Sequence, residues 1–372
     1  MYQFTSESVS EGHPDKVADL ISDHIATWLI NHNIHNRAAI ETLVTTNKVI
    51  VAGEYRTDRE ENVEESVRGI IIDTVKQLGY EQEGFHWDKL EIEYLLHGQS
   101  SDIALGTDNF GAGDQGIMFG YANRETEHYM PFAIAYSHKI LQELSNRRKS
   151  LSKYKDIILP DSKCQLTINY GAPNIPIDVS NVVVSTQHHK DAKQQQVEDL
   201  VREVVKDVIP KEFFTDNTNY QINPTGRFVI GGPDGDTGLT GRKIVVDTYG
   251  GYAPHGGGAF SGKDFTKVDR SAAYMSRWLA KNIVHKYDLE DCLVQLSYVI
   301  GIEQPSSLVI YANGELRLDL INMIKKEVDL TPKGIIQTLE LENVILPDTT
   351  NYGHFGDSNT GNSLITWEDF TL

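Results

Sequence analysis

The spacing of apolar residues along the first hundred positions changes from a helical to an extended period. Apolar residues from Val17 to Leu29 recur every three or four positions, which predicts a helix. Pro14 and Asp15 suit its first turn, because proline lacks an N–H that this turn leaves unpaired and an acid complements the positive helix end. The elements expected next are a hairpin of strands 39–45 and 48–54 joined at Thr46-Asn47, a helix over 63–78 closed by Gly79, and a strand over 90–96.

The order strand, strand, helix recurs three times, beginning near residues 39, 165 and 292. This order predicts an α+β protein of three related domains, which we place at residues 1–101, 112–230 and 231–372. The tail from Leu346 is rich in Asn, Thr and Gly, so we expect it to lie on a surface or to close over a neighbour. The later expected elements are helices over 130–144, 192–208, 270–287 and 316–328, and strands over 165–170, 179–186, 292–300 and 307–312.

The densest chemical signal is the stretch 231–274, which holds 11 of the 30 glycines. Two glycine-rich segments flank an apolar run over 243–247 that predicts a strand. Glycine lets main-chain N–H groups approach phosphate oxygens, and Lys and Arg supply the opposing charge, so the stretch suits a polyphosphate. The cations at the ends of the two segments are Arg242, Lys243, Lys263 and Lys267. The interspersed acids Asp236 and Asp269 suit ribose hydroxyls or Mg²⁺.

Two common nucleotide motifs are matched only in part. The run 257–263 has the spacing of a phosphate-binding P-loop, but Asp264 stands where a Ser or Thr should bind Mg²⁺, and no apolar strand leads into the run. Gly111, Gly113 and Gly116 have the spacing of the dinucleotide fingerprint, yet the strand that this motif requires does not directly precede them. We therefore expect neither a P-loop NTPase nor a nicotinamide enzyme.

Composition restricts the partners. The formal net charge of −19 argues against nucleic acid and anionic membranes, because a basic footprint is missing, and it makes any triphosphate site a local cationic pocket. The two cysteines, Cys164 and Cys292, indicate neither a disulfide framework nor a thiolate zinc site. No apolar signal core and no run of about 18 apolar residues occur, so we expect a soluble cytoplasmic protein.

Three further residues suggest chemistry by their surroundings. His13, in the sequence HPDK, stands just before the first expected helix and can donate a hydrogen bond to a phosphate oxygen. Glu41 and Glu54 interrupt apolar strands, which indicates a partner for each acid.

The stretch 231–274 resembles the C-terminal signature of the methionine adenosyltransferase (S-adenosylmethionine synthetase) family, through GLTGRK, DTYGG, GGGAFSGKD and KVDRSAAY. The resemblance covers nearly the whole chain, with SESVSEGHPDK, HGQS, GAGDQG and INPTGRFVIGG as further matches. It implies three interlocked α+β domains with a pseudo-threefold arrangement, and a homodimer-based assembly, often a homotetramer, with active sites between subunits. The implied reaction joins ATP and L-methionine to S-adenosylmethionine and then cleaves the tripolyphosphate to phosphate and pyrophosphate.

The resemblance also implies a role for each matching residue. His13, Lys163, Arg242, Lys243, Lys263 and Lys267 are expected on the polyphosphate; Asp15 and Asp269 on Mg²⁺, two ions per site; and Glu41 on K⁺. Glu54, Gln99 and Asp114 are expected at the methionine, Asp161 and Asp236 at the ribose and the methionine side, and Phe228 against the adenine, with Arg227 beside it. Five positions depart from the family pattern, namely Ser101, Asp234, Thr237, Phe265 and Asp357, and affect loop stiffness and the shape of the methionine pocket.

The stretch 98–113 is polar and glycine-hinged and contains Gln99, so we expect it to act as a lid over the substrates. The rival functions are another nucleotide-dependent transferase, such as a kinase, which would phosphorylate a second substrate, and a non-catalytic nucleotide-binding protein, which should have lost a cation or an Mg²⁺ ligand.

Overall fold

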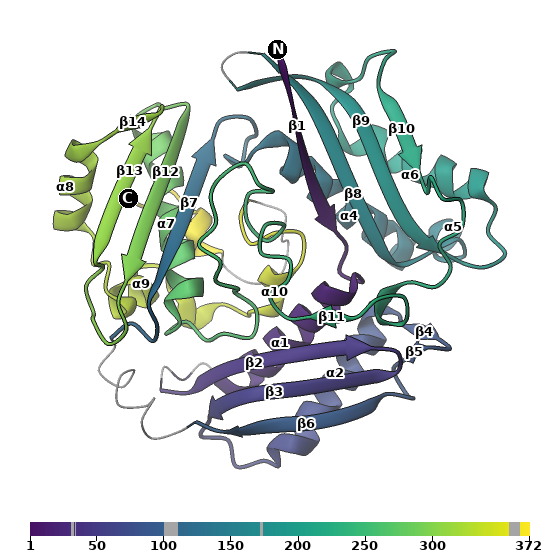
Figure 1. Cartoon of the computed structure of the whole chain (residues 1–372), viewed down its shortest axis with the longest axis horizontal. Helices are drawn as coiled ribbons and strands as arrows, with labels where there is room; N and C mark the ends of the chain where they lie inside the picture. The colour runs from purple at the N-terminus through teal and green to yellow at the C-terminus, as the bar shows by residue number, and fades with distance from the viewer. Residues whose placement is uncertain (31–32, 34, 100–110, 172–173, 357–364) are drawn as a thin grey trace.

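The structure is a computed structural model that describes residues 1–30, 33, 35–99, 111–171, 174–356 and 365–372. Three four-stranded sheets surround a centre that holds β11 and the glycine-rich chain next to it (Figure 1). The first sheet has the order β1 (Tyr2–Val9), β8 (Ile158–Gly171), β9 (Ile175–His188) and β10 (Asn219–Ile222). The second has β11 (Gly238–Leu239), β2 (Arg37–Thr45), β3 (Lys48–Arg56) and β6 (Glu91–Gly98). The third has β14 (Glu315–Leu316), β13 (Ser307–Ala312), β12 (Asp291–Tyr298) and β7 (Gly116–Asn123).

Two longer helices accompany each sheet, and α1, α2 and α4 lie behind the sheets in the view of Figure 1. They are α1 (Pro14–Ile30) and α2 (Val63–Leu78), α4 (Phe132–Ser150) and α6 (Gln194–Val208), and α7 (Val268–Lys286) and α8 (Leu318–Glu327). Shorter elements include α5 (Ser152–Lys155), α9 (Pro332–Thr338), α10 (Pro347–Thr350) and the hairpin of β4 (Glu81–Gln82) and β5 (Phe85–His86). No helix of the described residues is long and apolar enough to cross a membrane.

The three sheets are interlocked by a cyclic exchange of strands. β1 precedes α1 in the chain but pairs with β8, whereas α1 packs on β2. In the same way β7 pairs with β12 while α4 packs on β8, and β11 pairs with β2 while α7 packs on β12. The connections from β1 to α1, from β7 to α4 and from β11 to α7 therefore each join two different sheets, which gives the fold its threefold character.

Burial follows the alternation of the strands. In β2 the side chains of Ala38, Ile40 and Val44 are buried toward α1, and Glu41 points to the opposite, exposed face. β12 shows the same pattern, with Cys292, Val294 and Leu296 buried, and nearly all of α7 is buried. Because helices cover only one face of each sheet, the other face stays half exposed on the single chain.

The predicted α+β class, the threefold hairpin–helix order and most of the elements are confirmed. α2 spans 63–78 as predicted, and Gly79 closes it in the left-handed conformation with φ 85°. β8 and β9 are 14 residues each and so exceed the predicted runs, and Asp161 and Lys163 lie inside β8 and not at its entrance. The strands β1 and β7 were not predicted, since their sequences are polar or rich in glycine. The bounds of the three domains stay a prediction.

One prediction was wrong. The run 243–247 forms turns and not a strand: Asp247 N–H donates to the Lys243 carbonyl at 2.8 Å, and Gly250 N–H donates to the Val245 carbonyl at 2.9 Å. Local bonds satisfy the backbone there, so its β-branched residues do not extend. Of the two alternatives for the tail, a surface position does not hold for Phe355 and Trp367, which are buried in the core at 1% and 0% exposure, and closure over a neighbour stays a prediction.

Candidate active site

The start of α1, strand β8 and the glycine-rich chain enclose a cavity of about 170 Å³. Five of the predicted site residues line it: His13, Asp161, Lys163, Phe228 and Asp236. They come from positions more than 200 residues apart, so the fold brings together what the sequence separates. Pro14, Ile230, Gly231, Gly232 and Gly235 complete the wall. A cavity lined by a cation, an aromatic ring, two carboxylates and main-chain glycine suits a polar ligand with an aromatic part.

His13 is held as a neutral hydrogen-bond donor. Its side chain is buried, and Nδ1 accepts the main-chain N–H of Asp15 at 3.1 Å, which leaves the proton on Nε2. Burial, with the nearby charges of Lys243 and Lys163, lowers the pKa of His13 to about 3. The ring therefore donates from Nε2 without carrying a charge of its own, which suits contact with a phosphate or leaving oxygen.

Only one of the two carboxylate oxygens of Asp161 has a hydrogen-bond partner among the described residues. Oδ2 accepts the N–H of Gly232 at 2.8 Å, whereas Oδ1 is buried and has no hydrogen-bond partner among the described residues. Burial raises the pKa of this carboxyl to about 6. A buried acceptor without a partner is costly, so a ligand hydroxyl in the cavity would complete it.

Asp15 lies at the start of α1 beside the first cationic segment. Oδ1 accepts the N–H of Leu239 at 3.0 Å, and Oδ2 contacts Lys243 Nζ at 2.5 Å. Arg242 Nε lies 3.8 Å from Oδ1 and its side chain is about half exposed, at 53%. Burial raises the pKa of Asp15, but the bonds from Lys243 and Leu239 outweigh it and bring the pKa below its usual value. Asp15 is therefore ionised, with Lys243 as its partner.

The same pairing of an aspartate with a lysine recurs at the end of the second glycine-rich segment. Lys263 Nζ contacts Asp269 Oδ2 at 2.6 Å, and Lys267 Nζ contacts Asp264 Oδ2 at 2.5 Å. Asp269 stands so close to the second glycine-rich segment that a Cβ on Gly258 would lie 2.3 Å from its Oδ1. Only glycine fits there, which explains one glycine of the stretch by contact and not by turn geometry alone.

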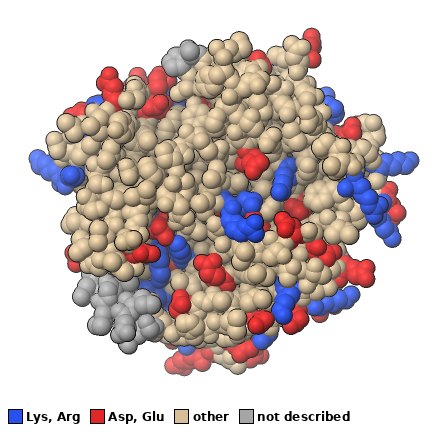
Figure 2. Space-filling view, viewed as in Figure 1, with Lys and Arg blue, Asp and Glu red and all other residues tan. Residues whose placement is uncertain are grey.

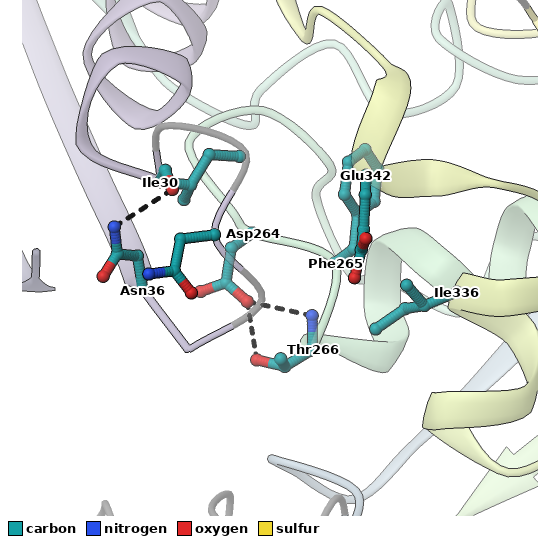
Figure 3. Close-up of a pocket in the computed structure, with 8 residues that line it drawn as sticks. Ile30, Asn36, Asp264, Phe265, Thr266, Ile336 and Glu342 are labelled. Carbon is teal, nitrogen blue, oxygen red and sulfur yellow. Dashed lines mark hydrogen bonds between the residues drawn. The ribbon is translucent and has the colours of Figure 1, made fainter.

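Asp264 is a residue whose importance the sequence did not reveal. Its Oδ2 accepts the N–H of Ala38 at 2.8 Å as well as the Lys267 bond, and its Oδ1 accepts from Thr266. The P-loop comparison drew attention to this position only because it lacked a hydroxyl. Figure 3 shows Asp264 and Thr266 on one side of a small cavity of about 40 Å³, with Phe265 and Ile336 on the other. Phe265, one of the departures from the family pattern, is thus a buried packing residue.

The remaining predicted residues do not line this cavity. Glu41 and Glu54 extend from the uncovered face of β2 and β3, and burial together with other charges raises the pKa of Glu41. Gln99 follows β6, and its side-chain oxygen is buried with no hydrogen-bond partner among the described residues. Asp114 and Arg227 are exposed, each next to a glycine-rich turn. Figure 2 shows basic and acidic side chains side by side near the middle of the face of the molecule that is in view.

Comparison with known proteins decides which chemistry this constellation serves. Three family models match the chain: the N-terminal domain of S-adenosylmethionine synthetase at residues 1–101, its central domain at 109–228 and its C-terminal domain at 230–369. The chain belongs to the S-adenosylmethionine synthetase family. The S-adenosylmethionine synthase of Parvibaculum lavamentivorans is 50% identical over 100% of this chain and 96% of its own. That of Paramagnetospirillum magneticum is also 50% identical, over 100% and 97%.

A solved structure, of an unusual S-adenosylmethionine synthetase from Campylobacter jejuni, matches the fold with a TM-score of 0.89 and 36% identity. It covers 100% of this chain and 97% of that one. The chain is therefore a transferase that makes S-adenosylmethionine from ATP and L-methionine, and the predicted family, fold and enzyme class are confirmed.

The donors offered to metal ions by this synthetase chain are single carboxylates. Among the residues that the structure describes, no three His, Cys, Asp or Glu side chains lie close enough together to hold a metal ion. Mg²⁺ commonly takes one or two carboxylates and fills its shell with water and substrate phosphates. Asp15 and Asp269, each paired with a lysine, fit that kind of ligation, and their hard oxygens suit Mg²⁺.

Some expectations for this synthetase fall outside the described residues. Most of the predicted lid, together with Ser101, lies within residues 100–110, and Asp357 lies within 357–364. Of the other departures, Asp234 Oδ1 accepts a hydrogen bond from Thr46 at 3.3 Å, and Thr237 donates one to Thr45 at 3.1 Å. Both therefore attach the first glycine-rich segment to the hairpin turn of β2 and β3.

We predict opposite effects of Asp161→Asn on stability and on ATP binding. Above pH 6 the folded enzyme holds a buried charge that the unfolded chain solvates freely, so removing it should raise the melting temperature by several degrees. This gain should shrink as the pH falls below 6 and should vanish only near about pH 3, where the wild-type carboxyl is protonated in both states. ATP affinity should fall at pH 8, because an acceptor for a ligand hydroxyl is weakened.

Thermal unfolding at pH 8 and pH 4.5, with titration of a non-hydrolysable ATP analogue at pH 8, checks both parts. A variant that is less stable than the wild type at pH 8 would contradict the assignment of Asp161 as an unsatisfied buried charge. Unchanged affinity for the analogue would remove Asp161 from the nucleotide site.

Proposed function

We propose that the methionine sulfur attacks C5′ of the ATP ribose in line, and that this chain acts mainly by orienting the substrates and stabilising the departing triphosphate. Such a displacement needs no protein nucleophile. The observation that carries the proposal is the cavity that places His13, Lys163 and Asp161 around one space, beside the Asp15–Lys243 pair. A neutral donor, a lysine and a hydroxyl acceptor match a leaving oxygen, a phosphate and a ribose.

The proposed nucleotide roles are those that the family resemblance implies, and the cavity lining of His13, Asp161, Lys163, Phe228 and Asp236 supports them. Phe228 stacks on the adenine with Arg227 beside it, and Asp161 accepts a ribose hydroxyl. Asp236 faces the ribose and the methionine side. His13 donates from Nε2 to the chain of phosphates at the leaving oxygen. The cations that neutralise the phosphates are Lys163, Arg242, Lys243, Lys263 and Lys267.

Asp15 and Asp269 would hold Mg²⁺, two ions per site, and Glu41 would hold K⁺. The bound cations neutralise charge on the triphosphate and organise the site. In the free chain each of these two aspartates pairs with a lysine at 2.5 or 2.6 Å. Binding of the substrate then requires an exchange of partners, in which Lys243 and Lys263 turn from the carboxylates to phosphate oxygens.

The methionine end is assigned to the exposed face of the second sheet. Glu54 there carries a side chain that is 41% exposed, and the buried oxygen of Gln99 is free to accept a hydrogen bond from an ammonium group. Asp114 would lie near the same end of the substrate. Since the Glu54 side chain is still 41% exposed with His97 Nε2 3.7 Å away, we infer that the substrate site needs a further wall.

We propose that a second copy of the chain supplies that wall. Glu41, Glu54 and Lys163 all point from sheet faces that no helix covers, and apolar Leu95 shares the face of Glu41 and Glu54 at 50% exposure. A homodimer buries such faces and closes the site, and two dimers give the expected homotetramer. Light scattering should therefore report a multiple of 41.7 kDa, and a monomer at working concentration would contradict this assembly.

The proposed second step is hydrolysis of the tripolyphosphate to phosphate and pyrophosphate before release, on the same cations. We also propose that the enzyme works in the cytoplasm, in keeping with two free, buried cysteines in the described chain. The test is incubation with ATP, methionine, Mg²⁺ and K⁺ over a range of salt, with chromatography of all products. Equal amounts of S-adenosylmethionine, phosphate and pyrophosphate are expected. Accumulating tripolyphosphate would refute the second step, and a phosphorylated co-substrate would indicate a kinase.

A further inference from the structure

Helix α1 carries three aspartates four residues apart, Asp15, Asp19 and Asp23, which share one face of the helix. Oδ1 of each accepts a main-chain N–H from the glycine-rich stretch. The donors are Leu239 at 3.0 Å, Gly241 at 2.8 Å and Gly262 at 2.8 Å, in that order. One rigid helix thus contacts both glycine-rich segments, over about 12 Å of its length.

Asp19 differs from Asp15 because it cannot reach a ligand. Its side chain is fully buried at 0% exposure, with Oδ1 on Gly241 and Oδ2 on Lys16 Nζ at 3.0 Å. Lys16 is itself buried and also donates to Asp247 at 2.7 Å. Among the described residues, the part of the site that Asp19 contacts is therefore the main chain directly before Arg242 and Lys243.

The backbone around Gly241 is tightly constrained. Its φ is +78°, a conformation that other residues rarely adopt, and a Cβ there would lie 2.6 Å from the side chain of Ala259 in the second glycine-rich segment. The two segments therefore meet at Gly241. A shift of its N–H would move Arg242 and Lys243 relative to the other cations.

We propose that Asp19 is a positioning residue for the triphosphate, which acts by fixing Gly241 and through it the two cations that follow. This inference rests on the proposed function, because it assumes that Arg242 and Lys243 bind phosphates. Binding of the triphosphate should then depend on the acceptor at position 19, whereas binding of methionine should not.

Three variants separate this role from a purely structural one. Asp19→Ala removes the acceptor for Gly241, and Asp19→Asn keeps an acceptor but loses the charge. Both leave Lys16 its pair with Asp247. Asp247→Asn is the matched control, since it alters the same buried ion cluster without touching the bond to Gly241.

Calorimetric titration with Mg²⁺ and inorganic tripolyphosphate gives the binding readout, and steady-state kinetics give KM for ATP and for methionine. We expect Asp19→Ala to weaken tripolyphosphate binding and raise KM for ATP about tenfold, with Asp19→Asn recovering to within about threefold. Asp247→Asn should bind tripolyphosphate as the wild type does. KM for methionine should change less than about twofold in all three variants.

Wild-type affinity in Asp19→Ala, or equal losses in Asp19→Ala and Asp247→Asn, would overturn the positioning role. If Asp19→Ala does not fold, amide hydrogen exchange of the peptide around Gly241 decides between wild type, Asp19→Asn and Asp247→Asn. Faster exchange in Asp19→Asn alone supports the role, and equal exchange in all three refutes it. A wild type that binds no tripolyphosphate refutes the proposed function itself.

Discussion

Asp15→Asn should lower kcat by about a hundredfold to a thousandfold, because it removes the charge that holds Mg²⁺ beside the leaving group. The fold should change little. Asparagine still accepts the N–H of Leu239, so the variant loses only the contribution of the charge, which the bond from Lys243 favours in the folded state. Lys243, freed from its 2.5 Å contact, is about 20% exposed and can remain solvated. Steady-state kinetics at saturating substrates and Mg²⁺, with thermal unfolding of the ligand-free variant, measure both effects.

Asp319→Asn is the matched control, since it removes one carboxylate charge from an exposed pair with Arg317, far along the chain from the site. It should keep wild-type kcat. If Asp15→Asn keeps kcat within threefold of the wild type, Asp15 does not act as a metal ligand. A fall of ten degrees or more in its melting temperature would assign Asp15 a structural role.

Asp23→Asn should destabilise the fold by about 3–5 kcal/mol, because it leaves the buried guanidinium of Arg270 without its counter-charge. Both side chains are 0% exposed, and their oxygens and nitrogens meet at 2.7 and 3.1 Å. Thr350 adds a hydroxyl bond at 2.6 Å, and Gly262 adds its N–H. Chemical denaturation of the ligand-free protein gives the free energy of unfolding.

The pH dependence of this pair has a definite sign. Burial raises the pKa of Asp23, but the pair with Arg270 outweighs burial and brings the pKa below its usual value. Its contribution is then fully present above about pH 4 and is lost only as the pH falls through the lowered pKa. Between pH 6 and 8 the difference between Asp23→Asn and the wild type should stay constant.

Glu64→Gln serves as the control for Asp23→Asn. It breaks a pair with Arg68 at 2.7 Å that lies on the exposed side of α2. Such a pair contributes less than about 0.5 kcal/mol. A loss below 1 kcal/mol in Asp23→Asn would show that the Asp23–Arg270 pair does not carry the stability that its burial indicates.

Sequence periodicity predicted those elements whose apolar residues follow one face. α2 was placed to the residue by its apolar spacing and Gly79, and the structure adds an N-cap at Asn62 that agrees with both. β7 was missed because its sequence, GIMFGYAN, contains two glycines. One of them, Gly120, is required by packing: a Cβ there would lie 1.9 Å from the backbone of Ser276 in α7. Such a requirement is set by a neighbour that local sequence does not reveal.

The same limit applies to the site. Glycine and cation spacing, with the family resemblance, indicated which residues to examine, and five of them line one cavity. The exchange of β1, β7 and β11 between sheets, which creates that cavity, depends on long-range pairing and has no local signal. The spacing of Asp15, Asp19 and Asp23 was visible in the sequence, but only the contacts to Gly241 and Gly262 give it meaning.

An experimental structure with a non-hydrolysable ATP analogue, methionine and Mg²⁺ would show whether this cavity binds the nucleotide. We predict a ribose hydroxyl on Asp161 Oδ1, phosphate oxygens on His13 Nε2 and Lys163, and Lys243 turned from Asp15 to the triphosphate. We also predict Mg²⁺ on Asp15 and Asp269. A nucleotide bound outside this cavity, with the 2.5 Å contact between Asp15 and Lys243 unchanged, would contradict these predictions.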